Sequence, residues 1–201
     1  MNGFATRRHA IKRFTLALVT PLLLLSCSAL ATQSLSNIPE RYDKYFQKYQ
    51  RLLPVATDWR LLKAQCYQES RLDPSAVSPV GAMGLCQFMP ATWREFQARY
   101  ELDNPWRPDQ SIRAAALYMN ELHSGWSSPR PAPDRYMLAL ASYNAGFGNL
   151  LAAQRKCDMA VLYSEIIPCL EQVTGHHSDE TRGYVRLIVG KWYPLLLTGG
   201  Y

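Results

Sequence analysis

The sequence predicts an all-α protein with a single globular domain. Apolar residues recur at helical spacing in several segments, and capping residues or prolines open these segments. No run of alternating apolar and polar residues is long enough for a useful β-strand, and there is no internal repeat. Of the 201 residues, 48% are hydrophobic and 19% are charged, which excludes an intrinsically disordered chain.

Residues 1–31 have the pattern of an export signal. Four basic residues precede the apolar run 14–25, which is too short for a stable membrane anchor. Two processing sites fit this pattern. Ala29-Leu30-Ala31 suits ordinary signal peptidase, whereas Leu24-Leu25-Ser26-Cys27 resembles a lipobox that would leave a lipidated Cys27. We therefore expect export to the periplasm, either as a soluble protein or as an outer-membrane lipoprotein attached through Cys27.

The positive charge of the chain is concentrated in that signal. The formal net charge is +6, from 22 basic and 16 acidic residues. Residues 1–26 hold four basic side chains and no acid, so the rest carries 18 basic and 16 acidic side chains, a net charge of +2. This weak bias removes the main support for nucleic-acid binding.

The remaining cysteines agree with export. Cys66, Cys86, Cys157 and Cys169 are an even number, which permits two disulfides with three connectivities in an oxidising compartment. Cys157 and Cys169 are close in sequence and could close a short loop, and Cys66–Cys86 is the complementary pair. Buried free thiols are the alternative.

The first helices are predicted from spacing and caps. Residues 32–54 are read as a flexible leader followed by an amphipathic helix over 41–53 that packs on the domain. Thr57 or Asp58 can cap a second helix that runs to about Arg71 and is stopped by Asp73-Pro74. Residues 72–90 are rich in Pro, Gly, Ser and Ala, and they predict an ordered loop with short turns.

Four further helices are predicted after this loop. One opens at Pro90 and reaches about Tyr100, and a long one starts at Asp109. The long helix carries one apolar stripe, formed by Ile112, Ala115, Ala116, Met119 and Leu122. A surface loop over 127–133 precedes a buried helix over 134–144. The last helix starts at Ser178-Asp179-Glu180, and its apolar face consists of Val185, Ile188, Trp192 and Leu195.

Glu69 is the candidate acid of the sequence. Leu62, Cys66 and Glu69 are four and three residues apart, so Glu69 points where two core residues point. A partly desolvated carboxyl has a raised pKa and can donate a proton to a leaving oxygen. The alternative for this residue taken alone is a solvated Glu near a helix end.

Two later segments offer groups that suit sugars. Gly81 and Gly84 would let the backbone approach a ligand closely, and Gln87 offers a donor and an acceptor to hydroxyl and acetamido groups. Tyr143 can stack on a sugar or donate its hydroxyl, and Asn144-Ala145-Gly146 is a helix stop. The alternative is that Met89 and Tyr143 are core residues and that Glu180 only complements a helix dipole.

Four blocks occur in a fixed order along the chain. They are Glu69-Ser70; Pro74-x-Ala76-x-Ser78 with Gly81-Ala82-x-Gly84-Leu85-x-Gln87-x-Met89-Pro90-x-Thr92; Tyr143-Asn144-Ala145-Gly146; and Glu180-Thr181-x-x-Tyr184-Val185. In this order the blocks resemble the lytic transglycosylase (SLT) family, relatives of goose-type lysozyme. The resemblance covers residues 55–195. It departs at Cys86, where Met or another apolar residue is usual, and at Ser142, where Ala is frequent.

The resemblance implies a lysozyme-like catalytic domain over 55–197 that acts on peptidoglycan glycan strands. Glu69 would be the single acid/base. It would protonate the bridging oxygen of the β-1,4 bond between N-acetylmuramic acid (MurNAc) and N-acetylglucosamine (GlcNAc). It would then accept the proton of the MurNAc C6 hydroxyl as a 1,6-anhydro ring closes. Further positions map onto the family's groove or onto residues that orient its acid: Ser70, Gln87, Met89, Tyr143, Asn144 and Glu180.

A second catalytic carboxylate, or a different reaction, would be an alternative to this mechanism. Ordinary glycosidases need two carboxylates. Asp73 is the only close second acid, but it precedes Pro74 and is expected to turn the chain, and Glu180 is treated as a positioning residue. The competing functions are a lysozyme-like muramidase and a non-catalytic murein-binding module of an envelope-spanning machine. If the protein opens the cell wall locally for a larger machine, its partner would be secretion, conjugation or phage machinery.

Cofactors and aromatic platforms are not expected. His176-His177 has no third ligand at metal-site spacing, so neither a metal nor another cofactor is predicted. Tryptophans are expected to pack in the interior rather than to stack on sugars: Trp93, Trp106, Trp126 and Trp192.

Overall fold

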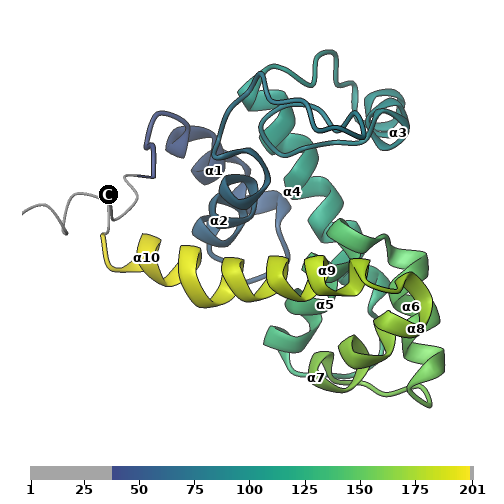
Figure 1. Cartoon of the computed structure of the whole chain (residues 1–201). Helices are drawn as coiled ribbons and strands as arrows, with labels where there is room; N and C mark the ends of the chain where they lie inside the picture. Colours follow the sequence, from purple (N-terminus) through teal and green to yellow (C-terminus); the bar gives the residue numbers. More distant parts are fainter. Residues whose placement is uncertain (1–37, 200–201) are drawn as a thin grey trace, which may run out of the picture. The chain divides into compact units, whose positions relative to one another are not determined.

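The computed structural model describes residues 38–199, which form an all-helical domain (Figure 1). The longer helices are α1 Asp43–Tyr49, α2 Trp59–Ser70, α3 Pro90–Tyr100, α4 Pro108–Gly125, α5 Ala132–Ala145, α6 Phe147–Lys156, α9 His177–Leu187 and α10 Tyr193–Leu197. Shorter elements are η1 Gln50–Leu52, α7 Tyr163–Ile166, η2 Ile167–Leu170, α8 Glu171–Thr174 and the π-helical turn η3 Ile188–Trp192. The all-α prediction is confirmed. The expected export signal and Cys27 lie outside the described residues.

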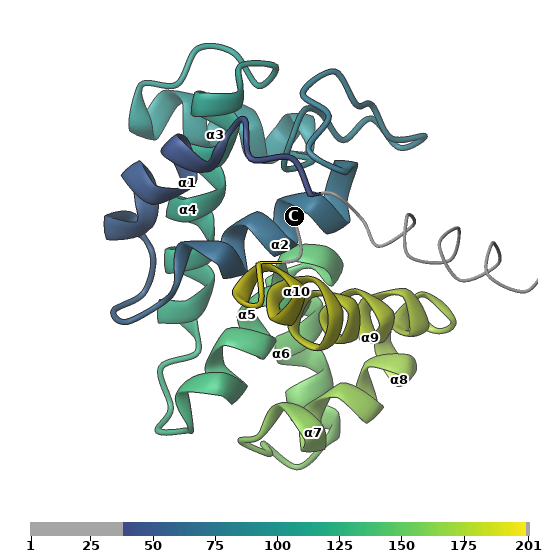
Figure 2. The same ribbon diagram turned by 90° about the vertical axis from the view of Figure 1, so that its left-hand side faces the viewer.

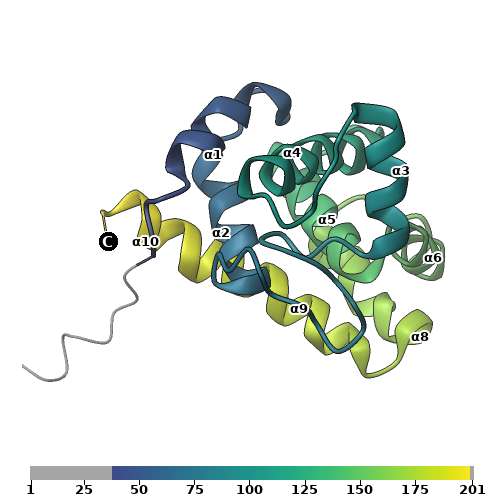
Figure 3. The same ribbon diagram turned by 90° about the horizontal axis from the view of Figure 1, so that it is seen from above.

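Helix α2 is the central element, and it ends at the candidate acid. The Asp58 carboxylate caps it by accepting the Arg60 N–H at 2.9 Å. Arg71 and Leu72 both adopt left-handed backbone conformations, with φ of 58° and 62°, so the helix stops before Asp73-Pro74. In Figures 1, 2 and 3 α2 lies between α1 and the line formed by α9, η3 and α10. Both ends of the predicted helix are confirmed to within about a residue.

Helix α1 is fastened to α2 by a buried ion pair. Lys63 is 0% exposed, and its Nζ lies 2.6 Å from Oδ1 of Asp43. Phe46 and Tyr49 are buried in the same core as Leu62. The predicted covering helix therefore packs on the domain, although it is shorter than the expected span of 41–53.

Helices α4 and α5 contribute many of the remaining core residues. The predicted apolar stripe of α4 is buried throughout. Helix α5 begins at Ala132, two residues earlier than predicted, because Pro131 to Pro133 form its first turn. It ends at Gly146, whose φ of 89° allows α6 to begin at once. The sequence signals at residues 147–174 are weak, and helices α6 to α8 were not predicted there.

The C-terminal helices form one line along the domain. Figures 1 and 2 show α9 running through η3 into α10, with α1 to α4 on one side and α6 to α8 on the other. Val185, Ile188 and Trp192 are buried along this line, as predicted, and Leu195 is half-buried. The helix starts at His177, so this histidine does not lie in the expected loop.

Both expected disulfides are present. Cys66 of α2 is bonded to Cys86 of the 72–89 loop, and Cys157 after α6 is bonded to Cys169 of η2. Within this loop two isolated bridges, Val77 to Met83 and Met83 to Phe88, replace regular strands. The first disulfide therefore ties the loop to the end of α2 that carries Glu69.

Between residues 38 and 199 there is no helix with the length and apolar character that crossing a bilayer requires.

Candidate active site

Glu69 lies in the last turn of α2 and lines a cleft of about 540 Å³. The walls come from the end of α2, the 72–89 loop, the end of α5 and the first turns of α9. In Figure 1 this loop lies above α2 and α9 lies below it. The cleft brings together Glu69 and five other residues singled out in the sequence: Gln87, Met89, Tyr143, Asn144 and Glu180.

The Glu69 side chain is half-buried, and one strong donor holds its carboxyl. The Tyr184 hydroxyl donates a hydrogen bond to its Oε1 at 2.5 Å. Burial raises the pKa of Glu69 to about 8, the Tyr184 hydrogen bond opposes this rise, and the negative charge of Glu180 adds to it. The carboxyl is therefore largely protonated at neutral pH, as a general acid requires.

Tyr184 of α9 is the residue that the site prediction missed. Burial raises the pKa of its hydroxyl well above the usual value of 10, so the hydroxyl stays a donor at every relevant pH. Its position carried a signal, because it is four residues after Glu180 in the last sequence block and so shares a helix face with it. The missing information was that this face meets the end of α2.

Tyr143 uses its hydroxyl within the protein. The hydroxyl donates to the carbonyl oxygen of Cys86 at 2.7 Å, which fixes the cleft side of the loop to α5. Its ring packs at 5.2 Å from the ring of Tyr118 and 6.0 Å from that of Phe88. Tyr143 therefore presents part of its ring to the cleft while its hydroxyl holds the loop.

Gln87 and Met89 form the loop side of the cleft. Nε2 of Gln87 donates to the carbonyl oxygens of Gly84 at 2.9 Å and Ala76 at 3.1 Å, so the amide nitrogen stabilises the loop. The amide oxygen of Gln87 can accept a hydrogen bond from a ligand. Met89 is 43% exposed and so is not the core residue that was the alternative.

Ser70 does not line the cleft. Its hydroxyl donates to the carbonyl oxygen of Leu85 at 2.7 Å and accepts the Asp73 N–H at 3.1 Å. Both contacts fix the 72–89 loop to the end of α2. The structure therefore places Ser70 in the support of the loop, whereas the resemblance implied a residue that lines the groove or orients the acid.

Asn144 and Glu180 lie where α5 meets α9. Oδ1 of Asn144 accepts the Thr181 hydroxyl at 2.7 Å, which joins the two helices. Glu180 is exposed at the rim. The two residues also line an adjoining hollow of about 440 Å³, to which Asn149, Thr174 and His177 contribute.

The distribution of carboxylates differs from the sequence expectation. Asp73 is exposed, and its carboxylate accepts the N–H and the hydroxyl of Ser75 at 2.8 and 2.7 Å. These hydrogen bonds lower its pKa, and Asp73 turns the chain as expected. Asp73 does not line the cleft, whereas Asp179 and Glu180 of α9 line it with Glu69.

The structure also bears on metal ligands and on the exposure of the tryptophans. Among residues 38–199, no group of three His, Cys, Asp or Glu side chains is placed to hold a metal ion. Trp93, Trp126 and Trp192 are buried, as expected. The expectation is wrong for Trp106, which is 40% exposed because the loop after α3 turns its side chain outward.

The chain is similar in sequence to several known proteins. A family model described as the transglycosylase SLT domain matches residues 45–160. The membrane-bound lytic murein transglycosylase F of Maricaulis maris is 34% identical over 158 residues, which cover 73% of this chain and 34% of that protein. The protein of the same name from Alcanivorax borkumensis is 44% identical over 93 residues, covering 46% of this chain and 19% of that protein. The chain thus spans about a third or less of these relatives.

Solved structures share the fold. The 70-kDa soluble lytic transglycosylase of Escherichia coli matches with a TM-score of 0.63 and 23% identity, covering 81% of this chain and 25% of that one. The lytic transglycosylase Slt of Pseudomonas aeruginosa matches with a TM-score of 0.62 and 25% identity, covering 80% of this chain and 25% of that one. The described helices therefore have the arrangement of a domain found within larger proteins.

Proposed function

Because the chain belongs to the transglycosylase SLT domain family, we propose that it is a peptidoglycan lytic transglycosylase. It cleaves the β-1,4 bond between MurNAc and GlcNAc and leaves 1,6-anhydro-MurNAc ends. The observation that carries the proposal is the half-buried Glu69 carboxyl, whose pKa is raised to about 8 by desolvation in a cleft lined by hydrogen-bonding side chains. The names of the relatives support the same substrate class.

The reaction needs one proton to move out and back. Protonated Glu69 gives its proton to the glycosidic oxygen as the bond from that oxygen to C1 of MurNAc breaks. The resulting carboxylate accepts the proton of the C6 hydroxyl, whose oxygen forms the new bond to C1. No water is consumed, and Glu69 ends the cycle protonated. The Tyr184 hydrogen bond supports the first half, because it stabilises the carboxylate that forms when the proton leaves Glu69.

The other cleft residues have binding roles in this proposal. Gln87 and Asn144 offer amide groups to sugar hydroxyl and acetamido groups, and Met89 with the ring of Tyr143 offers an apolar surface. Glu180 acts as a positioning residue, since its charge helps to keep Glu69 protonated. Ser70 supports the loop that carries Gln87.

A lysozyme-like muramidase is the second candidate, favoured by the presence of Glu180 in the same cleft. A hydrolase of this kind uses a second carboxylate as nucleophile or as base for water. Glu180→Gln separates the two reactions. In a transglycosylase the variant keeps substantial activity, whereas in a two-carboxylate hydrolase it loses activity as completely as Glu69→Gln.

The direct test is the mass of the products from purified murein. Muropeptides lighter by one water than hydrolysis products support the transglycosylase, and reducing-end products overturn it in favour of the muramidase. Glu69→Gln should abolish cleavage and retain binding to sacculi, and an unchanged rate would exclude Glu69 as the acid. Binding without any cleavage by the unmodified chain would instead identify a non-catalytic murein-binding module.

We also propose that residues 1–31 deliver the catalytic domain over 55–197 to the periplasm. The tripartite pattern of the signal and the two disulfides support export. The mass of the mature N-terminus decides between the two processing sites. A chain that begins at Thr32 is soluble, whereas a diacylated Cys27 attaches the enzyme to the outer membrane.

A further inference from the structure

Trp106 differs from every other tryptophan of the chain in its exposure. All five tryptophans lie within the described residues, and four are less than a tenth exposed: Trp59, Trp93, Trp126 and Trp192. Trp106 is 40% exposed and lies outside the catalytic cleft. With Pro74 and Ser75 it lines a shallow hollow of about 370 Å³. A large flat apolar side chain is thus kept in solvent beside a small depression.

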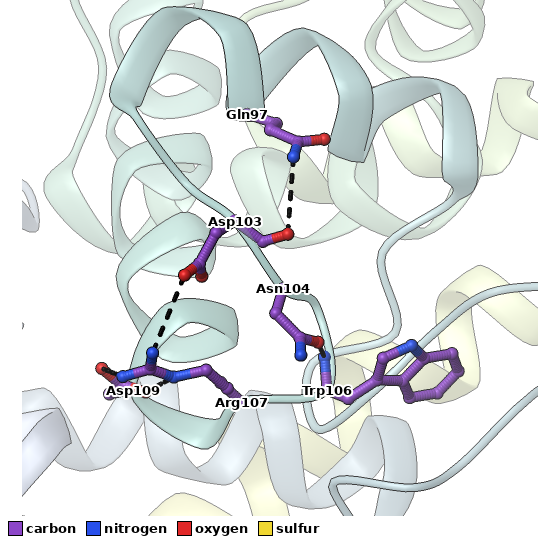
Figure 4. A network of polar contacts seen from close by, with 6 residues as sticks. All are labelled: Gln97, Asp103, Asn104, Trp106, Arg107 and Asp109. Carbon is purple, nitrogen blue, oxygen red and sulfur yellow. Dashed lines mark hydrogen bonds and ion pairs between the residues drawn. The ribbon is translucent and has the colours of Figure 1, made fainter.

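The loop that carries Trp106 is held in one conformation by polar contacts (Figure 4). Oδ1 of Asn104 accepts the backbone N–H of Trp106 at 2.9 Å. Nε2 of Gln97 donates to the carbonyl oxygen of Asp103 at 3.4 Å. Figure 4 shows the indole pointing away from this network. The ring is therefore presented by a preorganised loop, which lowers the entropy cost of using it as a binding surface.

Arg107 closes the same loop at its other end. It forms ion pairs with Asp109 at 3.2 Å and with Asp103 at 3.7 Å. The first of these joins the loop to the opening turn of α4. The indole points away from these ion pairs, and the polar side chain beside it is Ser75, whose hydroxyl can accept a hydrogen bond from a sugar hydroxyl group.

Gly84 connects this loop to the wall of the catalytic cleft. Its φ is +71°, and its N–H donates to the carbonyl oxygen of Ala76 at 2.9 Å. A Cβ at this position would lie 2.3 Å from the carbonyl oxygen of Pro105, so only glycine permits the approach. The 72–89 loop thus has Ser78 and Gln87 on the cleft and Pro74 and Ser75 beside Trp106.

We propose that Trp106, with Pro74 and Ser75, forms a second glycan-binding platform outside the cleft. The indole stacks on the C–H face of a sugar ring, and the Ser75 hydroxyl accepts a hydrogen bond from a hydroxyl group of that ring. The ligand class is a peptidoglycan glycan strand, so the inference rests on the proposed function. A second contact with the same polymer raises the effective concentration of substrate at the cleft.

The experiment measures binding in the Glu69→Gln background, where the polymer is not cut. The probe is soluble uncrosslinked glycan strands released from murein by an amidase. Because the other four tryptophans are buried, acrylamide quenching reports mainly on Trp106. Saturating glycan should protect Trp106 from the quencher. Unchanged quenching at concentrations that saturate the cleft overturns the platform, and this readout requires no change at Trp106.

A second measurement uses variants. Trp106→Ala in the same background should weaken co-sedimentation with sacculi by about tenfold, and Trp106→Tyr should restore most of the binding. Leu197→Ala, which removes another exposed apolar side chain, is the matched control and should bind as before. Equal binding by Trp106→Ala, or protection of Trp106 by anionic vesicles and not by glycan, overturns the proposal. The product masses test the proposed function separately, since they do not depend on Trp106.

Discussion

The Tyr184 hydroxyl lies 2.5 Å from Oε1 of Glu69, although the two residues are 115 positions apart in sequence. This contact joins the end of α2 to α9 at the centre of the cleft. It opposes the effect of burial, which raises the pKa of Glu69 to about 8. Burial and the Tyr184 hydrogen bond thus change the pKa of Glu69 in opposite directions, and substitutions can test each effect separately.

Tyr184→Phe removes the influence that favours the carboxylate. The pKa of Glu69 should rise further, so the alkaline limb of the kcat profile should move to higher pH. The maximal kcat should fall by about 10- to 100-fold, the range for a lost hydrogen bond to a charged group. A pH–rate profile on soluble glycan strands checks both effects. An unchanged alkaline limb would show that Tyr184 does not act on the ionisation of Glu69.

Glu180→Gln should move the same limb in the opposite direction. The negative charge of Glu180 raises the pKa of Glu69, and its removal lowers that pKa. The alkaline limb should therefore begin at lower pH, with kcat below the limb reduced by less than about tenfold. Glu171→Gln removes an exposed acid from α8 and serves as the charge control. A shift to higher pH in Glu180→Gln, or an equal shift in the control, contradicts this assignment.

Glu69→Gln should stabilise the fold, and by more at high pH. The folded pKa of Glu69, about 8, is above its ordinary value of 4.5. The favourable contribution of the protonated carboxyl is complete below about pH 4.5 and is lost as pH rises through about 8. Glutamine is neutral at both pH values. The free energy of unfolding of the variant should therefore exceed that of the unmodified protein by about 2–4 kcal/mol at pH 9 and by little at pH 4.

Urea unfolding at the two pH values measures this difference in the free energy of unfolding. Glu101→Gln, at an exposed position after α3, is a suitable control because it should show no such dependence on pH. A Glu69→Gln difference that is the same at pH 4 and pH 9 would mean that the carboxyl is not desolvated in the folded protein.

Local signals in the sequence predicted the elements that carry the site. The Asp58 cap, the Pro90 start and the apolar stripe of α4 each depend on residues within one or two helical turns, and each is found as expected. The inward direction of Glu69 follows in the same way from its spacing to Leu62 and Cys66. Helices α6 to α8 were missed because α6 has no side-chain cap and α7 and α8 have four residues each, and all three are stabilised by packing on α5 or α9.

Contacts between distant segments account for the rest. Ser70 and Gln87 are both polar and follow the acid in sequence, but only the folded loop shows that Ser70 donates to Leu85 while Gln87 reaches the cleft. The exposure of Trp106 likewise depends on contacts that the sequence does not show. Its outward direction depends on Gly84 meeting Pro105 and on Asn104 holding its N–H, and spacing along the chain reveals neither contact.

The two disulfides should differ in their effect on catalysis. Removing either pair with alanines should cost about 3 kcal/mol of stability, the chain-entropy value for loops of this size. Only the Cys66–Cys86 bond joins the two sides of the cleft. The backbone of Cys86 accepts the Tyr143 hydroxyl and donates to Ser111, so a displaced residue 86 would also displace Gln87.

We therefore expect Cys66→Ala/Cys86→Ala to lower kcat/KM by about tenfold or more, measured well below the melting temperature. Cys157→Ala/Cys169→Ala, a matched control whose bond joins the end of α6 to η2, should keep the activity of the unmodified protein at that temperature. Equal losses in the two variants would assign both disulfides to stability alone. They would also show that the hydrogen bonds of Tyr143, Ser111 and Ser70 suffice to hold the 72–89 loop in place against α5, α4 and α2.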